Sequence, residues 1–394
     1  MFFVILVIMK TILFLAMLLV AELLFLLSPW SPQVFENRDD VRFEKEISTK
    51  DINYTFTLKD FYANSPVLDT QVDAAYKKLS KRQRVAELLM PAVGSNGLPV
   101  ATVEKMIATD AIGGFMLLGK GVSKADIERL KQKALLYKDV PLLVSIDAEP
   151  SLVSSRLPAI GQVGKTSSYT TKESVQSVAG TISSFIKEYG FSVNFAPVYD
   201  INKNKAVIGS RSHGSTTKSA ANLADAFSEV SMNMNVVPVA KHFPGHGNVI
   251  GDSHKLLPII SSDLVELDSF RSAIDMGIPM IMTGHLAVEG GKYDTGGKPA
   301  TLSSVIQKDL LRDELGFEGV VITDAFNMHA LKGFRNNELE SLKAGADIIL
   351  MPQTASTQII ESVLREAQSD PIFEKELEEK VKRVLRLKFS IPNL

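Results

Sequence analysis

Short apolar runs alternate with amphipathic stretches along most of the chain. Seven runs of four to seven residues have the character of buried strands, at 112–118, 142–146, 193–198, 236–240, 278–282, 320–323 and 348–351, and 256–260 is a weaker eighth candidate. The apolar spacing between them predicts helices, among them 124–137, 173–189, 220–234, 264–276 and 303–315. Continuous apolar strands that alternate with helices indicate a parallel sheet covered on both faces.

About eight such strand–helix units fit an α/β fold of the (β/α)8 TIM-type barrel class. The alternative is a doubly wound open sheet. We expect residues 64–394 to form this single catalytic barrel. Both folds place their active sites at the carboxyl ends of the strands.

The N-terminal residues have a different pattern from the rest of the chain. Residues 1–29 are almost entirely apolar, interrupted by Lys10 and Glu22, and residues 11–27 approach the length that spans a bilayer as a helix. We therefore predict that residues 1–30 form a signal peptide or a membrane anchor helix. The anchor is favoured because no cleavage site with small residues, as signal peptidase requires, follows near residue 30. Residues 31–63 are expected to form a charged tether. The catalytic part is expected outside the cytoplasm, anchored to the membrane, or secreted if the N-terminal segment is cleaved.

Composition narrows the classes of protein further. The 43 Lys and Arg residues nearly balance 45 Asp and Glu residues, for a net charge of −2, which argues against nucleic acid as a partner. The 394 residues contain no cysteine, which excludes disulfides, thiolate metal sites and a cysteine nucleophile. The hydrophobic share of 45% is that of a folded globular protein.

Charged or imidazole side chains end five of the predicted strands. They are Asp147, Asp200, the pair Lys241 and His242, His285, and Asp324. One polar residue at a strand end is common, but removing five such groups from water at one mouth has a cost that folding alone does not require. These strand ends therefore predict a functional site.

Residues 241–254 read KHFPGHGNVIGDSH and contain three of the six histidines. Gly245, Gly247 and Gly251 predict a mobile loop of the kind that closes over an active site. Asp252 and His254 are two residues apart, so that they can form a hydrogen bond in an extended or turn conformation. A carboxylate that orients an imidazole makes a proton shuttle that works near neutral pH.

The segment KHFPGHGNVIGDSH resembles the signature of glycoside hydrolase family 3, specifically its single-domain β-N-acetylhexosaminidases. Supporting segments are NFAPVYD followed by VIGSRSHG, then MTGHLAV, GVVITDAFNM and LKAGADIILMP, so that the resemblance covers roughly residues 79–390. It implies a retaining exo-β-N-acetylhexosaminidase that releases N-acetylglucosamine from peptidoglycan fragments or chitin-like oligosaccharides. It also implies that the enzyme needs no metal or organic cofactor.

The resemblance further implies roles for individual residues. Asp324 is expected to be the nucleophile that forms a glycosyl–enzyme intermediate, and His254 the acid/base, oriented by Asp252. The residues expected to bind the substrate are Asp147, Arg156, Arg211, Lys241 and His242. His246 is expected to maintain the shape of the loop.

One segment departs from the family pattern Asp-Gln-Glu-Gly-Gly-Arg-Val-x-Arg. This chain has Asp-Ala-Glu-Pro-Ser-Leu-Val-Ser-Ser-Arg at 147–156, so that Pro150 and Ser151 replace the glycine pair and Leu152 replaces the first arginine. Arg156 stands one residue later than the second arginine of the pattern. The departure concerns substrate contacts and leaves the expected nucleophile and acid/base untouched.

Three alternatives compete with this interpretation. A β-glucosidase-like member of the family usually takes its acid/base from a second domain, whereas this sequence carries its own Asp–His pair. A barrel metallohydrolase would use His242, His246, Asp252 and His254 as zinc ligands, but these crowd one glycine-rich loop instead of several strand ends. A membrane-tethered sugar-binding protein without catalysis is supported only by the altered segment 147–156.

Overall fold

The computed structural model describes residues 55–137, 140–249 and 251–394. The predicted anchor at 1–30 and residues 31–54 of the predicted tether lie outside these residues. Phe56, Leu58 and Phe61, which belong to the end of the predicted tether, are buried in the core, so the packed part of the chain begins before residue 64. Within the described ranges, no helix combines the length and the apolar character needed to cross a membrane.

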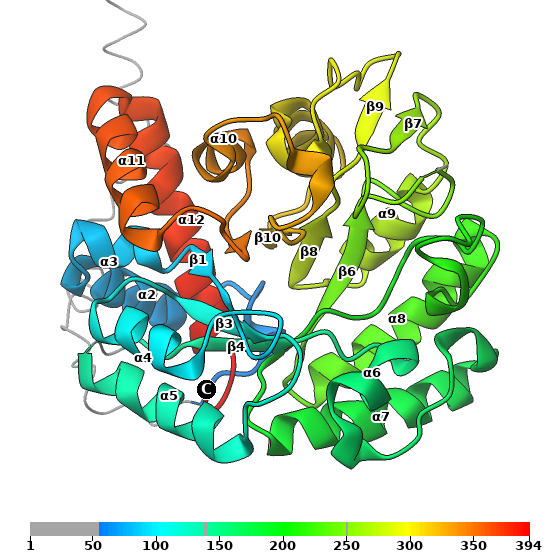
Figure 1. Ribbon diagram of the computed structural model, residues 1–394, viewed down its shortest axis with the longest axis horizontal. Coiled ribbons are helices and arrows are strands. Elements are labelled where there is room, and N and C mark those ends of the chain that lie inside the picture. Colours follow the sequence, from blue (N-terminus) through cyan, green and yellow to red (C-terminus); the bar gives the residue numbers. More distant parts are fainter. Residues whose placement is uncertain (1–54, 138–139, 250) are drawn as a thin grey trace, which may run out of the picture. The chain divides into compact units, whose positions relative to one another are not determined.

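The core of the fold is a curled parallel sheet (Figure 1). Its strands follow in the order β2 (Ala92–Val93), β3 (Gly114–Leu117), β4 (Leu143–Ile146), β5 (Val193–Asn194), β6 (Val237–Phe243), β8 (Met280–Thr283) and β10 (Val320–Thr323). β1 (Leu89–Met90), which only Pro91 separates from β2, pairs with β11 (Ile349–Leu350). A bridge between Ile322 and Ile348 joins β10 to this pair, so the two edges of the sheet are connected.

Helices follow the strands and cover the outside of the sheet (Figure 1). The larger ones are α2 (Pro66–Lys78), α4 (Val100–Ala108), α5 (Lys124–Tyr137), α7 (Lys172–Glu188), α8 (Thr217–Asn233), α9 (Leu267–Asp275), α10 (Asn337–Ala344), α11 (Ser356–Ser369) and α12 (Pro371–Phe389). Shorter helices are α3 (Lys81–Ala86), α6 (Pro150–Arg156), η5 (Gly209–Arg211) and η8 (His329–Leu331), and η7 (Val305–Glu314) is a π-helix.

Helix α7 illustrates why these segments are helical. Thr171 precedes it in an extended conformation, and the Thr171 side chain accepts a hydrogen bond from the backbone N–H of Ser174. This cap satisfies one of the free amides at the start of the helix. Val175, Val178 and Ile182 then recur every three or four residues and are buried on one side.

The predicted parallel sheet and its helices are confirmed. Each of the seven apolar runs contains or overlaps a strand, and α5 has the predicted bounds. The doubly wound alternative is wrong, because such a sheet has two free edges, whereas the pairing of β1 with β11 joins the edges here.

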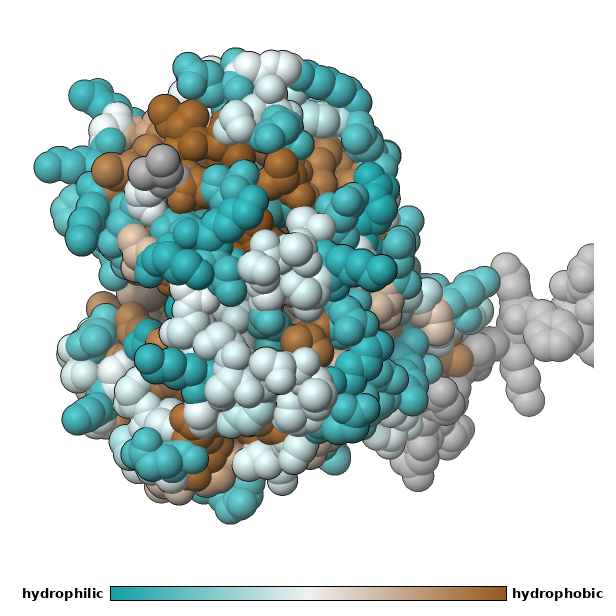
Figure 2. Space-filling view, turned by 90° about the vertical axis from the view of Figure 1, so that its right-hand side faces the viewer, coloured by the Kyte–Doolittle hydropathy of each residue, from teal (hydrophilic) through white to brown (hydrophobic). Residues whose placement is uncertain are grey.

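The prediction of a strand of the main sheet at 256–260 is also wrong. The strand in that region, β7 (Ile259–Ser261), pairs with β9 (Ala287–Glu289) in a separate two-stranded sheet. Leu256 and Ile259 are about half exposed, which a strand buried on both faces does not allow. Figure 2 views the side of the molecule that carries β7 and β9, and apolar side chains gather in the upper part of this surface. The missing strand is Leu89–Met90 with Ala92–Val93, whose apolar run is interrupted by Pro91.

Candidate active site

A pocket of about 370 Å³ opens where the strands of the main sheet end. Polar side chains that line it are Asp147, Arg156, Arg211, Lys241, His242, His246, Ser253, His254, Asp324 and Asn327. Seven of the eight residues expected in the site from the sequence are therefore brought together here. The eighth, Asp252, does not line the pocket and instead contacts His254.

Asp324 follows β10, and a backbone hydrogen bond of 2.9 Å to the carbonyl of Thr283 on β8 fixes its position. Its Oδ1 accepts a hydrogen bond of 2.8 Å from the N–H of Ala325. Burial raises the pKa of Asp324, but the nearby His242 and His285 and the Ala325 N–H outweigh burial and hold this pKa below its usual value. Asp324 is therefore a carboxylate near neutral pH.

Asp252 and His254 form the predicted pair. The Asp252 Oδ1 lies 2.9 Å from His254 Nδ1 and also accepts a hydrogen bond of 3.0 Å from the His254 backbone N–H. Burial raises the pKa of Asp252, but these two hydrogen bonds outweigh burial and lower it. An ionised Asp252 favours the tautomer in which His254 carries its proton on Nδ1, which leaves Nε2 for proton exchange. The His254 side chain is 64% exposed, so its Nε2 is accessible.

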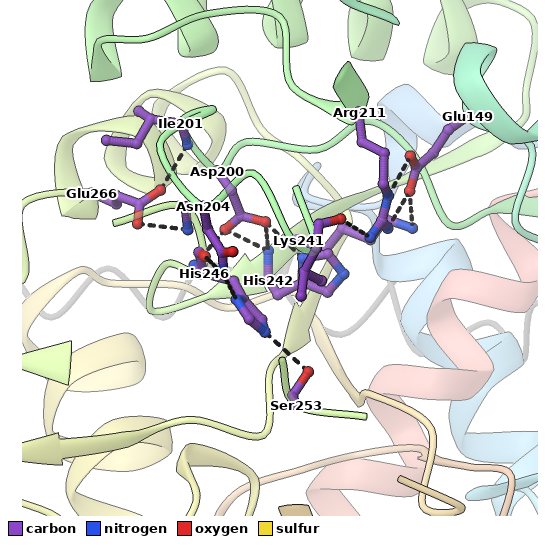
Figure 3. Close-up of polar contacts among 12 residues, drawn as sticks. Glu149, Asp200, Ile201, Asn204, Arg211, Lys241, His242, His246, Ser253 and Glu266 are labelled. Atoms are coloured by element: carbon purple, nitrogen blue, oxygen red, sulfur yellow. Dashed lines mark hydrogen bonds and ion pairs between the residues drawn. The ribbon is translucent and has the colours of Figure 1, made fainter. Parts of the chain in front are cut away.

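Glu149 links two of the expected substrate-binding residues (Figure 3). Its Oε1 lies 2.6 Å from Arg211 Nη2 and 2.7 Å from Lys241 Nζ, and its Oε2 accepts a bond of 2.9 Å from Arg211 Nε. Glu149 is 1% exposed. Burial raises its pKa, but Arg211 and Lys241 outweigh burial and hold the pKa far below the usual range. Lys241 Nζ also contacts Asp147 Oδ1 at 2.8 Å, so one buried network orients both cations.

Asp200 is a second buried anchor, and it holds His242 (Figure 3). It contacts His242 Nδ1 at 2.6 Å and accepts backbone N–H hydrogen bonds from His242 and His246. Burial raises the pKa of Asp200, but His242 and His246 outweigh burial and lower it. Consecutive residues of a regular strand point to opposite faces. Lys241 and His242 nevertheless both line the pocket, at the place where the register of β6 against β8 shifts.

The glycine-rich loop after β6 is anchored by Glu266. The Glu266 carboxylate accepts backbone hydrogen bonds from Ile201, Gly247 and Asn248. Burial and the charge of Asp200 raise the pKa of Glu266 to about 8, despite these three donors. A Cβ at Gly247 would lie 2.0 Å from the Ile201 carbonyl oxygen. This glycine is therefore required for close packing, whereas mobility was the role predicted for it.

The histidines proposed as zinc ligands are engaged in hydrogen bonds with other side chains. His242 contacts Asp200, His246 contacts the Ser253 hydroxyl, and His254 contacts Asp252. In the part of the chain that the structure describes, no three His, Cys, Asp or Glu side chains are arranged to hold a metal ion. The geometry thus gives the metallohydrolase alternative no support.

Asp200 is among the strand ends that predict the site, but the sequence assigned it no role. Glu149 belongs to the segment 147–156 that departs from the family pattern, but nothing in the sequence indicates that it pairs with residues 62 and 92 positions away. No sequence motif points to Glu266, because it precedes α9 and reaches the loop only through tertiary contacts.

An ionised carboxylate at a strand end and an Asp–His pair beside the same pocket are groups of the kind that hydrolases use for nucleophilic and acid–base catalysis. The family model for the "Glycosyl hydrolase family 3 N terminal domain" matches residues 80–387. The chain belongs to glycoside hydrolase family 3, as the sequence resemblance predicts.

Named proteins are similar in sequence to most of this chain. A β-hexosaminidase A of Pseudoalteromonas piscicida is 30% identical over 330 residues, which are 74% of this chain and 55% of that protein. The β-hexosaminidase LpqI of Mycobacterium tuberculosis is 30% identical over 312 residues, which are 73% of this chain and 77% of that protein. A solved family 3 β-N-acetylglucosaminidase from Paenibacillus sp. has a TM-score of 0.72 at 32% identity, over 79% of this chain and 63% of that one.

Proposed function

We propose that this chain is a retaining exo-β-N-acetylhexosaminidase. The observation that carries the proposal is that Asp324 and His254 line the same pocket while Asp252 holds His254 Nδ1. The names of the relatives support the class of substrate: those from Pseudoalteromonas and Mycobacterium are β-hexosaminidases, and the Paenibacillus structure is a β-N-acetylglucosaminidase.

In the first step, a carboxylate oxygen of Asp324 attacks the anomeric carbon. The bond to the leaving oxygen breaks as His254, in its imidazolium form, donates the Nε2 proton to that oxygen, which leaves a neutral imidazole with its proton on Nδ1 and produces a glycosyl–enzyme ester. In the second step, His254 removes a proton from water, which attacks the same carbon and releases Asp324. Two displacements retain the configuration, as in glycosidases with two carboxylates.

The other polar side chains of the pocket hold the sugar in this proposal. Lys241 and Arg211 are fixed by Glu149, and His242 is fixed by Asp200 through Nδ1, so these donors are held in place before the substrate arrives. Preorganised donors lower the barrier because they need no rearrangement during the reaction. N-acetylglucosamine from peptidoglycan fragments or chitin-like oligosaccharides is the proposed product.

A panel of chromogenic β-glycosides tests the proposal. The N-acetylglucosaminide is expected to be cleaved faster than the glucoside and the xyloside, with no acceleration by added phosphate and with full activity in EDTA. A preference for the glucoside would favour the β-glucosidase-like alternative, and loss of activity in EDTA would revive the metallohydrolase.

The covalent intermediate provides a direct test of the nucleophile. His254→Ala should slow the second step, so that a dinitrophenyl N-acetylglucosaminide leaves sugar attached to the protein. Mass spectrometry of the digested protein should find the added mass on the peptide that contains Asp324. Sugar attached elsewhere would refute this role.

We also propose that the apolar residues 1–30 carry the catalytic part out of the cytoplasm, as an uncleaved anchor or as a cleaved signal. Cell fractionation together with N-terminal sequencing of the mature protein tests this. A protein found in the cytoplasm would refute it.

A further inference from the structure

The catalytic pair lies on a short segment of the loop after β6, here called the flap (residues 251–256). Lys255 and Leu256 are exposed, as is His254, whereas Ser253 is 1% exposed. Ser253 is therefore the point at which the flap is tied to the body of the protein.

Two residues hold the flap from the side of β6 (Figure 3). His246 Nε2 lies 2.9 Å from the Ser253 hydroxyl. The Asn204 side-chain amide donates to the carbonyls of His246, at 3.2 Å, and of Gly251, at 3.0 Å. Because both partners are carbonyls, this atom is a donor, and the Nδ1 of His246 at 3.2 Å from it is an acceptor. His246 is then protonated on Nε2 and donates to Ser253.

The His246 ring is itself fixed. Its backbone N–H donates to Asp200 Oδ1 at 2.8 Å, and the side chain is almost completely buried. Burial and the neighbouring His242 lower the pKa of His246, which agrees with a neutral ring that donates through Nε2. Asp200 thus connects the flap with His242 in the pocket.

Helix η8 holds the same segment from the other side. His329 Nδ1 lies 2.9 Å from the His254 carbonyl, and the backbone N–H of Ala330 donates to the Ser253 carbonyl at 3.2 Å. These contacts constrain the backbone of the flap, whereas His246 is the side chain that reaches Ser253 from the floor of the pocket.

We propose that His246 is a positioning residue, whose hydrogen bond to Ser253 holds the flap closed so that His254 meets the substrate above Asp324. This inference rests on the proposed function, since it assigns His246 to the acid/base part of that reaction. It gives His246 no proton to transfer. His246 and Ser253 also line the pocket. The experiment must therefore distinguish positioning of the flap from a direct contact between these side chains and the sugar.

The experiment compares two substrates in purified full-length variants. Ser253→Ala removes the Ser253 hydroxyl oxygen, and His246→Ala removes the imidazole, so each breaks the hydrogen bond between these two side chains. His246→Gln retains an N–H donor near the position of Nε2. Ser262→Ala, at an exposed serine that follows β7, is the matched control. The substrates are the 2,4-dinitrophenyl N-acetylglucosaminide, which needs no acid, and a disaccharide, which does.

Leaving one partner of a buried hydrogen bond unsatisfied shifts the closing equilibrium by about fivefold or more. Ser253→Ala and His246→Ala should therefore lower kcat/KM for the disaccharide by about fivefold or more. For the dinitrophenyl substrate, kcat/KM should change by less than about twofold, because proton donation does not limit its first step. The two changes should not be additive in the double variant, and His246→Gln should restore most of the activity.

Equal losses on both substrates would mean that His246 contacts the sugar or supports the fold in general, and would overturn the proposal. Wild-type behaviour of Ser253→Ala on the disaccharide would overturn it as well. Hydrogen exchange of the flap amides, measured without substrate, should be faster in Ser253→Ala and His246→Ala but not in Ser262→Ala. If the wild type cleaves no N-acetylglucosaminide, the proposed function fails, and unchanged exchange then refutes the positioning role by itself.

Discussion

Replacing Glu149 by glutamine is expected to destabilise the protein more than any exposed carboxylate-to-amide change. Glu149 is 1% exposed and holds Arg211 through two hydrogen bonds and Lys241 through a contact of 2.7 Å. Glutamine is nearly isosteric but neutral, and its amide NH2 faces one of these cations. Lys241 then keeps only its contact of 2.8 Å with Asp147, and Arg211 loses a charged partner.

The magnitude follows from the burial of the three groups. Removing one partner of a buried ion pair costs about 3–5 kcal/mol, because it leaves an uncompensated charge away from water. Glutamine retains one acceptor oxygen, and Lys241 retains Asp147, so we expect the lower end, about 3 kcal/mol. At an unfolding entropy of about 2.1 cal/mol/K per residue, that loss lowers the Tm of a domain of this size by about 4 °C.

The loss should depend on pH in a defined direction. The Arg211 and Lys241 charges outweigh burial and hold the pKa of folded Glu149 below its ordinary value of 4.5. A group with a lowered folded pKa contributes its stability above the unfolded pKa, and this contribution is lost as the pH falls through the folded value. The difference between wild type and Glu149→Gln should therefore be complete at pH 7 and shrink below pH 4.5.

Urea denaturation at several pH values measures the effect, and Glu188→Gln is the matched control. Glu188 forms an exposed ion pair with Lys124 at 3.2 Å, and such pairs contribute less than about 1 kcal/mol. Because Lys241 and Arg211 line the pocket, Glu149→Gln should also lower kcat/KM, by about tenfold or more. If Glu149→Gln lost no more stability than Glu188→Gln, the description of Glu149 as the anchor of both cations would be wrong.

Four further results are expected. Asp324→Ala should lower kcat about a thousandfold or more, measured with the dinitrophenyl substrate, since the nucleophile is removed. In the first step, His254→Ala should lose activity on a disaccharide and little on the dinitrophenyl substrate, as comparison of kcat/KM will show. The kcat/KM of that activated substrate should remain constant down to about pH 5, because the pKa of Asp324 lies below its ordinary 3.8 and the group is then almost fully ionised; an acid limb well above about pH 5 would contradict this. Glu266→Ala should lower the free energy of unfolding by about 1–3 kcal/mol, measured in urea, because it leaves three backbone N–H groups without their acceptor.

Local patterns predicted most of the elements of the fold. The apolar spacing of α7 and α8 and the short apolar runs of the strands depend on neighbours in sequence, which is why their bounds agree with the structure within a few residues. The prediction of a main-sheet strand at 256–260 was wrong because an apolar run alone does not show whether both of its faces are covered. The strand at Leu89–Val93 was missed because Pro91 interrupts its pattern.

The candidate site was predicted in part. Strand ends and the loop at 241–254 located Asp147, Lys241, His242 and Asp324, because parallel strands bring their carboxyl ends to one edge. The roles of these residues in the reaction remain predictions. The sequence did not reveal the residues that support them. Glu266, for example, accepts hydrogen bonds from backbone amides that precede it by 18 or more positions.

The sequence by itself determined the alternation of strands and helices, the family, and the chemical groups available at the strand ends. Each of these depends on the identity and spacing of neighbouring residues. Only the tertiary structure decided which strand closes the sheet, and that Glu149 and Asp200 hold the cations and the imidazole of the pocket. Such pairings join residues tens to hundreds of positions apart, and their energies come from burial and charge compensation that exist only once the chain is folded.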